Sequence, residues 1–392
     1  IFAWPSQVFA DGSKAGFEAL QDQFRTNAPD GMLAGLFGYD LGSAFEDVPA
    51  HMARWPSLAF ARYPVWAEFD RTAATLTVRG RDAGLMTRLA DLLGSEPAAL
   101  PAAAALPGDG TASWIPRWSP GHYLAAARTA RDYVHAGDVF QVNLSQAFEA
   151  ELASGDDPYA VFERLCDASP APHAAYFRLD ADHVILTNSP ERFVSVRSGR
   201  VEARPIKGTR KRSGDPVEDA ALASELAASA KDRAENLMIV DLMRNDISRV
   251  CTPGSVHVPM LCAVETYANV HHLVSVVEGE LAAGRDVFDL VAASFPPGSI
   301  TGAPKVRAMQ IIAELEGESR GPYCGALGWI SEVGDMDLNV MIRTAAMRRE
   351  NGTWHATIRS GGGIVADSDP QAEYEETLTK VSALRQAVEG QA

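Results

Sequence analysis

Hydrophobic and polar positions change their period along the chain, and this predicts strands and helices in mixed order. Between Ser119 and Gly137 the apolar positions return every three to four residues, which predicts a helix with one buried face. Short apolar or alternating runs bounded by turn residues predict strands instead. We expect strands at 33–39, 74–78, 139–147, 173–179, 183–188, 192–197, 200–204, 324–331, 337–347 and 353–360.

Further helices are predicted at 217–243, at 287–293, from Pro304 onward, and at 370–388. Strands and helices do not alternate regularly, which favours an antiparallel α+β architecture. An Ala-, Pro- and Gly-rich stretch at 96–114 is typical of a connector. We therefore expect an N-terminal region at 1–95 and a larger domain at 115–392. Because the numbering begins at Ile1 and not at methionine, we expect the N-terminal region to be truncated.

Composition narrows the class of protein. The 392 residues are 46% hydrophobic and 22% charged, which is typical of a soluble globular protein. A net charge of −16 argues against electrostatic binding to nucleic acid or to an anionic membrane. No apolar run approaches the roughly 20 residues of a transmembrane helix. The four cysteines show no CxxC spacing, so we expect reduced thiols and a cytoplasmic location.

One lysine stands in an unusual setting. The chain has only six lysines, and Lys207 lies within PIKGT (205–209), between a rigid proline and a flexible glycine. A lysine removed from water can lose its proton near neutral pH and act as an amine nucleophile. Glu191 lies among apolar residues in SPERF (189–193), where a raised pKa suits a general acid.

Two acidic pairs recur with helical spacing. Asp232 and Glu235 share one face of a predicted helix, and Glu373 and Glu376 repeat this spacing in the last helix. Two such faces brought together would hold Mg²⁺ through oxygen ligands. Each pair alone is more often an ordinary solvated helix face.

Three other segments are candidates for ligand binding. The glycine run 361–363 can cradle an anion in a turn, or simply form a turn. Arg343 can grip a carboxylate or serve as a buried ion-pair partner. The loop 295–305 is rich in glycine, proline and hydroxyls and leads into a helix, which suits close approach to an anion. His272 precedes a strand-like run, and such histidines are more often structural.

Taken together, these segments resemble the chorismate-utilising enzymes. The matching segments are FQVNLSQ (140–146), SPERF (189–193), PIKGT (205–209), AENLMIVDLMRND (234–246), VHHLVS (270–275), FPPGSITGAPK (295–305), IRT (342–344), GGGIVADS (361–368) and AEYEET (372–377). They cover about residues 115–390, which makes 115–392 a chorismate-binding catalytic domain, and GLFGYDLG (35–42) is similar to the family's N-terminal region. The resemblance implies an α+β fold of the anthranilate synthase component I type, with two packed antiparallel sheets and helices outside.

The resemblance also implies roles for particular residues. Glu235 and Glu376 would be the main Mg²⁺ ligands, with Asp232 and Glu373 beside them through water. Asp232 departs from the glutamate common at that position, which leaves more water on the metal. The remaining binding residues fall into two groups. The enolpyruvyl carboxylate of chorismate would be held by Arg343, Tyr323 and the amides near Gly361 and Gly362, with Lys380 nearby; the ring site would be lined by His272 and Thr301.

Two positions indicate the branch of the family. Relatives that add water to chorismate place a lysine base where this chain has Gln141, which we assign to substrate binding. Anthranilate synthases typically read PIAGT, whereas Lys207 replaces the alanine here. The resemblance thus implies amination at C4 of chorismate, in the route to 4-aminobenzoate and folate. Lys207 would form an adduct at C2, and Glu191 would act as acid and then base.

The ammonia source is absent from this chain. None of the four cysteines has the setting of a glutaminase nucleophile, so a separate glutamine amidotransferase subunit is the expected partner. Two alternatives remain open at this point. One is the anthranilate synthase large subunit, a lyase that releases pyruvate, and the other is a non-catalytic relative that binds chorismate.

Overall fold

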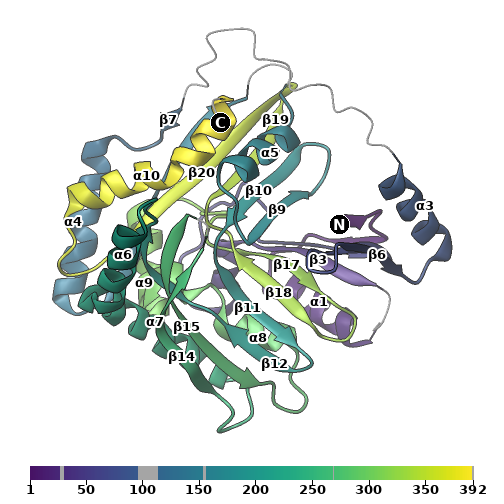
Figure 1. Cartoon of the computed structure of the whole chain (residues 1–392), viewed down its shortest axis with the longest axis horizontal. Coiled ribbons are helices and arrows are strands. Elements are labelled where there is room, and N and C mark those ends of the chain that lie inside the picture. The colour runs from purple at the N-terminus through teal and green to yellow at the C-terminus, as the bar shows by residue number, and fades with distance from the viewer. Residues whose placement is uncertain (27–30, 96–113, 153–155, 268, 391–392) are drawn as a thin grey trace.

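The computed structural model describes residues 1–26, 31–95, 114–152, 156–267 and 269–390 (Figure 1). The predicted connector at 96–114 lies almost wholly outside these residues, so the division into two regions stays a prediction. None of the helices in the described ranges is long and apolar enough to cross a membrane. The four cysteines are free thiols, and three of them are buried.

The larger sheet joins strands of the N-terminal region to strands from later in the chain. All its neighbouring strands pair antiparallel, and β3 (Met32–Phe37) pairs directly with β17 (Ala326–Ile330). The remaining strands, in spatial order, are β13 (Ile206–Lys211), β15 (Val270–Glu280), β12 (Arg200–Ala203), β11 (Arg192–Arg197) and β18 (Met336–Val340) on one side, and β4 (Leu58–Tyr63) and β2 (Gln7–Phe9) on the other, with β14 (His257–Thr266) also on β15. The N-terminal strands therefore complete a sheet built by the rest of the chain.

A second antiparallel sheet packs against the first. Its strands in order are β16 (Gly302–Ala303), β8 (Gln141–Glu151), β20 (Thr353–Ile364), β19 (Thr344–Glu350), β10 (His183–Ser189) and β9 (His173–Arg178), with β7 (Ile115–Pro116) on β8. Leu36 and Leu327 of the first sheet form one buried cluster with Ile185 of the second. A small third sheet consists of β1 (Phe2–Ala3), β5 (Val65–Asp70) and β6 (Thr75–Gly80).

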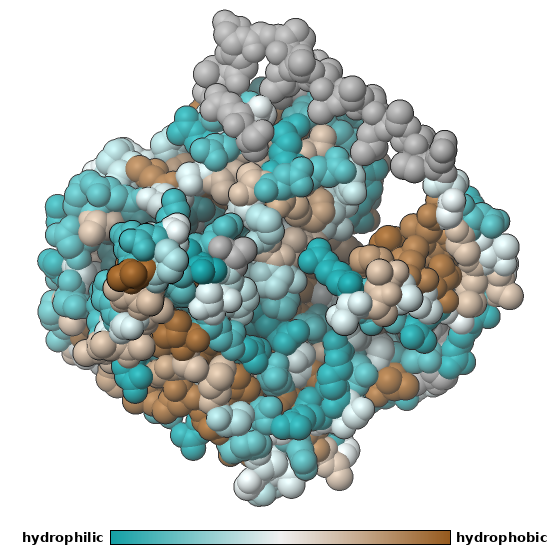
Figure 2. All heavy atoms as spheres, in the orientation of Figure 1, coloured by the Kyte–Doolittle hydropathy of each residue, from teal (hydrophilic) through white to brown (hydrophobic). Residues whose placement is uncertain are grey.

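Helices cover the outer faces of both large sheets (Figure 1). On the second sheet lie α4 (Pro120–Ala136), α5 (Pro158–Ala168), α9 (Lys305–Glu316) and α10 (Pro370–Glu389); on the first lie α6 (Pro216–Ala228), α7 (Ala230–Ser248) and α8 (Val287–Ser294). The N-terminal region adds α1 (Lys14–Thr26), α2 (Gly42–Phe45) and α3 (Ala83–Gly94), and short 3₁₀ turns lie at η1 (Tyr39–Leu41) and η2 (Gly298–Ile300). The predicted α+β class is confirmed. Figure 2 shows hydrophobic residues gathered around α3 and around α7 and β14 on an otherwise largely polar face.

Three details of the predicted elements are wrong. The helix expected at 217–243 is two helices, because Ser229 takes an extended backbone and its hydroxyl accepts the Asp232 N–H at 3.3 Å, which starts α7. The strand expected at 337–347 is interrupted, since Arg343 has φ +51°. The pattern also did not predict strands β4, β5, β13 and β14 or helices α1, α3 and α5.

A buried ion-pair network ties α9 to the second sheet. The Glu316 side chain is fully buried and accepts from Arg320 at 2.6 Å, from Arg359 at 2.8 Å and from the Ser145 N–H at 2.9 Å. Burial alone raises the pKa of Glu316, but the two guanidinium groups outweigh it and lower that pKa. The network fixes β8 and β20 relative to the end of α9.

Replacing Glu316 with glutamine is expected to destabilise the protein by about 3–5 kcal/mol, because buried Arg320 loses its carboxylate partner and buried Arg359 keeps only Glu318. Urea unfolding followed by circular dichroism measures the loss. The control is Glu314→Gln on the exposed side of α9, for which a change below about 1 kcal/mol is expected. Equal stability of the two variants would contradict the assigned role of the network.

Candidate active site

A β-bulge presents Lys207 to the interior. The pairing of β13 with β15 shifts between Lys207 and Thr209, and Gly208 takes φ +75° at the shift. A Cβ on Gly208 would lie 2.8 Å from Cγ of Asp232. Glycine is therefore favoured at this position both by the positive φ and by the lack of space for a side chain. The Lys207 amine donates a hydrogen bond to the Ser299 carbonyl at 3.2 Å. The bulge therefore aims the amine at the 295–305 loop.

Burial lowers the pKa of the Lys207 amine below its ordinary value. Although part of the residue stays exposed, its amine end is removed from water. The carboxylates of Glu235, Glu191 and Glu376 oppose this shift, and Lys380 reinforces it. An unprotonated amine is thus available at lower pH than in an exposed lysine.

Glu191 lies in the same interior as the amine. The carboxyl is buried and accepts the Ser299 hydroxyl hydrogen at 2.6 Å. Burial raises the pKa of Glu191 to about 7, even though Ser299, Lys207 and Lys380 each lower it. The group is therefore poised to give or take a proton near neutral pH, as predicted from its apolar surroundings.

The two acidic helix faces act on the same charged groups. Glu235 of α7 and Glu376 of α10 both act on the Lys207 amine, and Lys231 acts on both Glu235 and Glu373. Burial raises the pKa of Glu235 and that of Glu373. Glu235 and Glu373 are therefore partly removed from water, whereas the Glu376 side chain stays half exposed.

Three of the four acidic side chains have a hydrogen-bond or ion-pair partner within the protein. Asp232 pairs with Arg210 at 3.2 Å, Glu373 accepts from Ser368 at 2.7 Å, and Glu376 pairs with Lys380 at 2.6 Å. Within the described ranges, no group of three His, Cys, Asp or Glu side chains is arranged to hold a metal ion by itself.

The glycine run is strand and not turn, so the predicted anion-binding turn is wrong in its geometry. Residues 361–363 belong to β20 and pair with 143–145 of β8. β19 pairs with β20 only as far as Ile358, so the far edge of the glycine backbone carries no strand among the described residues. A Cβ on Gly362 would lie 2.8 Å from Oε2 of Glu373. The glycines thus leave space in front of the acidic residues, and the Gly361 carbonyl accepts from Lys380 at 3.0 Å.

Gln141 is buried next to Gly363 and has an unsatisfied amide. A Cβ on Gly363 would lie 2.7 Å from its Nε2. The side chain is fully buried, and within the described residues neither of its amide atoms has a hydrogen-bond partner. Buried amides are normally paired, so this orphan indicates a position for a ligand group.

Arg343 and His272 lie near one another. No carboxylate of the described residues forms an ion pair with Arg343, and burial lowers the pKa of its half-buried guanidinium. Burial also lowers the pKa of His272, and the charge of Arg343 adds to this effect. The His272 ring is held by a hydrogen bond of 2.9 Å between Nδ1 and the Thr209 hydroxyl. An unpaired, partly buried arginine suits an anionic ligand.

Known proteins resemble this chain over most of its length. The family model for chorismate binding enzymes matches residues 7–386. The chain belongs to the chorismate binding enzymes. It is 44% identical to aminodeoxychorismate synthase component 1 of Klebsiella aerogenes over 376 residues, which are 94% of this chain and 80% of that protein. It is also 44% identical to the same component of Salmonella typhimurium, over 91% of this chain and 76% of that one.

A solved structure confirms the fold. The crystal structure of anthranilate synthase component I from Streptococcus pneumoniae superposes with a TM-score of 0.84 at 31% identity. The match covers 98% of this chain and 91% of the other. The predicted fold type, with two packed antiparallel sheets and helices outside, is therefore confirmed.

The acidic cluster consists of Asp232, Glu235, Glu373 and Glu376. Its carboxylates have the donor chemistry of a Mg²⁺ site. It offers carboxylate oxygens from two helices, and Mg²⁺ usually takes one or two carboxylates and completes its shell with water and substrate. The raised pKa values of Glu235 and Glu373 show that negative charge is costly there, which a divalent cation would relieve. The residues present fit the metal, with few direct protein ligands.

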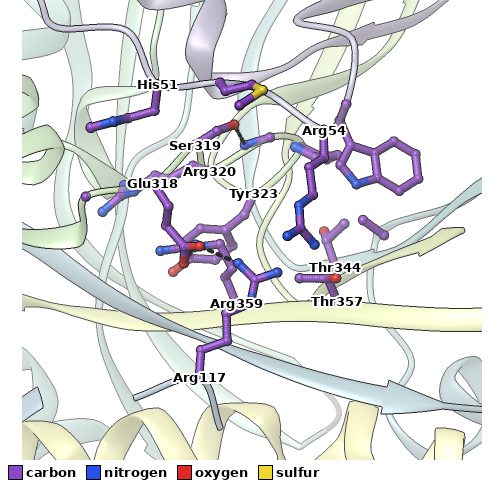
Figure 3. A pocket seen from close by; sticks show the side chains of 16 residues that line it. His51, Arg54, Arg117, Glu318, Ser319, Arg320, Tyr323, Thr344, Thr357 and Arg359 are labelled. Carbon is purple, nitrogen blue, oxygen red and sulfur yellow. Dashed lines mark hydrogen bonds and ion pairs between the residues drawn. The ribbon is translucent and has the colours of Figure 1, made fainter. Parts of the chain in front are cut away.

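Among the described residues, neither Thr301 nor Tyr323 forms a hydrogen bond with the Lys207 amine. The Thr301 hydroxyl is fully buried and donates to the Pro297 carbonyl at 2.8 Å, within its own loop. Tyr323 is buried beneath the Arg320 guanidinium, 5.7 Å from the ring centroid. Tyr323 also lines a cavity of about 320 Å³ whose walls carry Arg54, Arg117 and Arg359 (Figure 3).

Ser299 is the contact that the sequence did not single out. Its loop was identified as stiff and rich in hydroxyls, but nothing in the pattern distinguishes Ser299 from Thr301. Only the fold shows that the Ser299 backbone meets Lys207 while its side chain meets Glu191.

Glu191→Gln is expected to lower the pKa of Lys207 further, because the Glu191 carboxylate raises that pKa in the parent chain. The measurement is the pH dependence of acetylation by limiting acetic anhydride, read at Lys207 by peptide mass spectrometry. Exposed Lys14 is the internal control. Coincident labelling curves for Lys207 in the two proteins would show that the groups are not coupled.

Proposed function

We propose that the chain is component I of an aminodeoxychorismate synthase, which aminates chorismate at C4 with ammonia and gives 4-amino-4-deoxychorismate. The observation that carries the proposal is the pairing of an amine of lowered pKa at Lys207 with a buried carboxyl at Glu191. The names of the two relatives above support the same reaction. The product would serve 4-aminobenzoate and folate synthesis in the cytoplasm.

Chorismate would lie between the guanidinium group of Arg343 and the acidic cluster. Arg343 and Tyr323 would hold the enolpyruvyl carboxylate, with Lys380 and the open backbone at Gly361 and Gly362 beside them. The support is the absence of a carboxylate partner for Arg343 and the free edge of β20 in the described residues. Three further residues would line the site of the chorismate ring: His272, Thr301 and Gln141.

Mg²⁺ would be held chiefly by Glu235 and Glu376, with Asp232 and Glu373 reaching it through water. When bound, the cation supplies positive charge for the ring carboxylate of chorismate. Lys380 already shares charge with Glu376, so part of the acidic cluster is neutralised before any cation binds.

In the first step the unprotonated Lys207 amine attacks C2 of the ring, the ring double bonds shift, and the C4–O bond breaks. Glu191 in its acid form gives its proton to the departing C4 hydroxyl, which leaves as water. The Lys207 nitrogen keeps both hydrogens in the adduct, as a positively charged secondary ammonium, so that it can leave C2 as a neutral amine in the second step. In the second step ammonia attacks C4 and the bond from C2 to Lys207 breaks, with Glu191 as the base. The sum is chorismate plus ammonia giving aminodeoxychorismate plus water, with the enolpyruvyl group retained.

The ammonia would come from a separate glutamine amidotransferase, component II. The cysteines of this chain support a partner, since burial raises the pKa of Cys324 to about 12 and that of Cys251 to about 11. Such thiols are poor nucleophiles at neutral pH.

Anthranilate synthase activity is the second candidate, because the solved structure above carries that name. That reaction has no need of an amine at position 207, which speaks against it. A non-catalytic chorismate-binding role is disfavoured because the pKa of Lys207 is lowered and that of Glu191 is raised, as is common for catalytic groups.

The direct test is incubation of the purified chain with chorismate, Mg²⁺ and ammonium at mildly alkaline pH, with products identified by mass and absorbance. Aminodeoxychorismate without pyruvate is the expected result. Anthranilate with pyruvate would replace the proposal by the second candidate. Omission of Mg²⁺ is expected to abolish turnover.

Lys207→Ala is expected to lower ammonia-dependent turnover by at least about 10²-fold, because it removes the nucleophile. The matched control is Lys211→Ala at the exposed end of the same strand, which should retain the parent rate. Full activity of Lys207→Ala would exclude an essential covalent step.

The pH dependence of kcat/KM is expected to be bell-shaped, with one limb near pH 7. The protonated fraction of Glu191 falls as the pH rises through its pKa of about 7, while the unprotonated fraction of Lys207 rises with pH. Glu191→Gln should be slow and lack the limb near 7. Persistence of that limb in the variant would assign it to another group.

A further inference from the structure

We infer that Ser299 is a positioning residue that holds the Lys207 amine with its carbonyl and the Glu191 carboxyl with its hydroxyl, and so sets their mutual orientation for the reaction. The inference rests on the proposed function and extends it to a residue outside the predicted catalytic set.

The two contacts of Ser299 are complementary in polarity. Its carbonyl oxygen accepts from Nζ of Lys207 at 3.2 Å, and its hydroxyl donates to Oε1 of Glu191 at 2.6 Å. Ser299 and Glu191 are both buried, at 7% and 6% exposure, so water competes little for either contact. One residue therefore joins the nucleophile and the acid.

The turn that carries Ser299 is held at both sides. Gly298 packs so closely on Leu242 of α7 that a Cβ there would collide with that side chain. The Thr301 N–H closes the turn onto the Gly298 carbonyl at 3.2 Å. Beyond the turn, the buried Lys305 amine binds Asp246 at 2.6 Å and also the Ser294 carbonyl. Ser299 consequently sits on fixed backbone, as a positioning residue must.

These contacts decide where protons and lone pairs lie. Because Oε1 of Glu191 already accepts the serine hydrogen, the acid proton of Glu191 is held on Oε2. An amine of Lys207 that donates one hydrogen to the Ser299 carbonyl must direct its lone pair elsewhere, away from that oxygen. Ser299 thus leaves the reactive atom of each group free for substrate.

The hydroxyl also acts on the titration of Glu191. The charged groups that act on this carboxyl are Lys207 from β13 and Lys380 from α10, and the Ser299 hydroxyl lowers the pKa alongside them. Loss of the hydroxyl leaves burial less opposed, so the pKa of Glu191 rises.

Ser299→Ala is the decisive variant, since it removes the hydroxyl and keeps the carbonyl. We expect kcat to fall about tenfold with little change in KM for chorismate. We also expect the limb of the pH profile that belongs to Glu191 to move to higher pH, and Ser299→Thr to restore it. The control is Ser294→Ala, whose buried hydroxyl donates only to the Leu290 carbonyl at 2.7 Å.

A second readout separates this inference from the proposed function. The protonated carboxyl band of Glu191 is followed by infrared difference spectroscopy against pH, without chorismate, and assigned by its absence in Glu191→Gln. The band should persist to higher pH in Ser299→Ala than in the parent and in Ser294→Ala. An unmoved band, or a rate loss without a shifted pH limb, would overturn the inference. Failure of the parent chain to make aminodeoxychorismate would overturn only the proposed function.

Discussion

The site depends on one constraint, which is that the Lys207 amine is removed from water among carboxylates. Burial disfavours the ammonium form, whereas Glu235, Glu191 and Glu376 favour it, and the balance leaves the pKa lowered. The same interior raises the pKa of Glu191 to about 7. A nucleophile and an acid thus arise from opposite shifts in one environment, which is a common arrangement in enzymes that run acid and base chemistry together.

The fold produces this environment by joining distant segments. The bulge at Gly208 turns Lys207 inward, the η2 turn supplies Ser299, and the glycine stretch of β20 removes side chains in front of α10. The buried network around Glu316 fixes β8 and β20 to the end of α9, close to Tyr323. None of these ion pairs includes Lys207 or Glu191, so the network acts on the reaction by holding the backbone in place.

Much of the fold was predictable because the periods of hydrophobic positions were clear, and Lys207, Glu191 and the two acidic faces were identified from residue type and spacing. The break at Ser229 was not, since a serine inside a helical pattern caps a new helix only when its own backbone is extended. The run 361–363 suggested a turn, but pairing with β8 overrides the weak strand preference of glycine. The contacts of Ser299 depend on tertiary structure alone.

The central claim is that the Lys207 nitrogen bonds to the chorismate ring, and trapping that bond tests it most directly. The chain is mixed with chorismate and Mg²⁺ without ammonia, quenched, digested and mapped by mass spectrometry. The account predicts a peptide containing Lys207 that is heavier by the mass of chorismate less one water, and no such peptide after addition of ammonium or in Glu191→Gln quenched at the same time. Turnover to aminodeoxychorismate by a Lys207→Ala variant at the parent rate, with no modified peptide in the parent chain, would contradict the account.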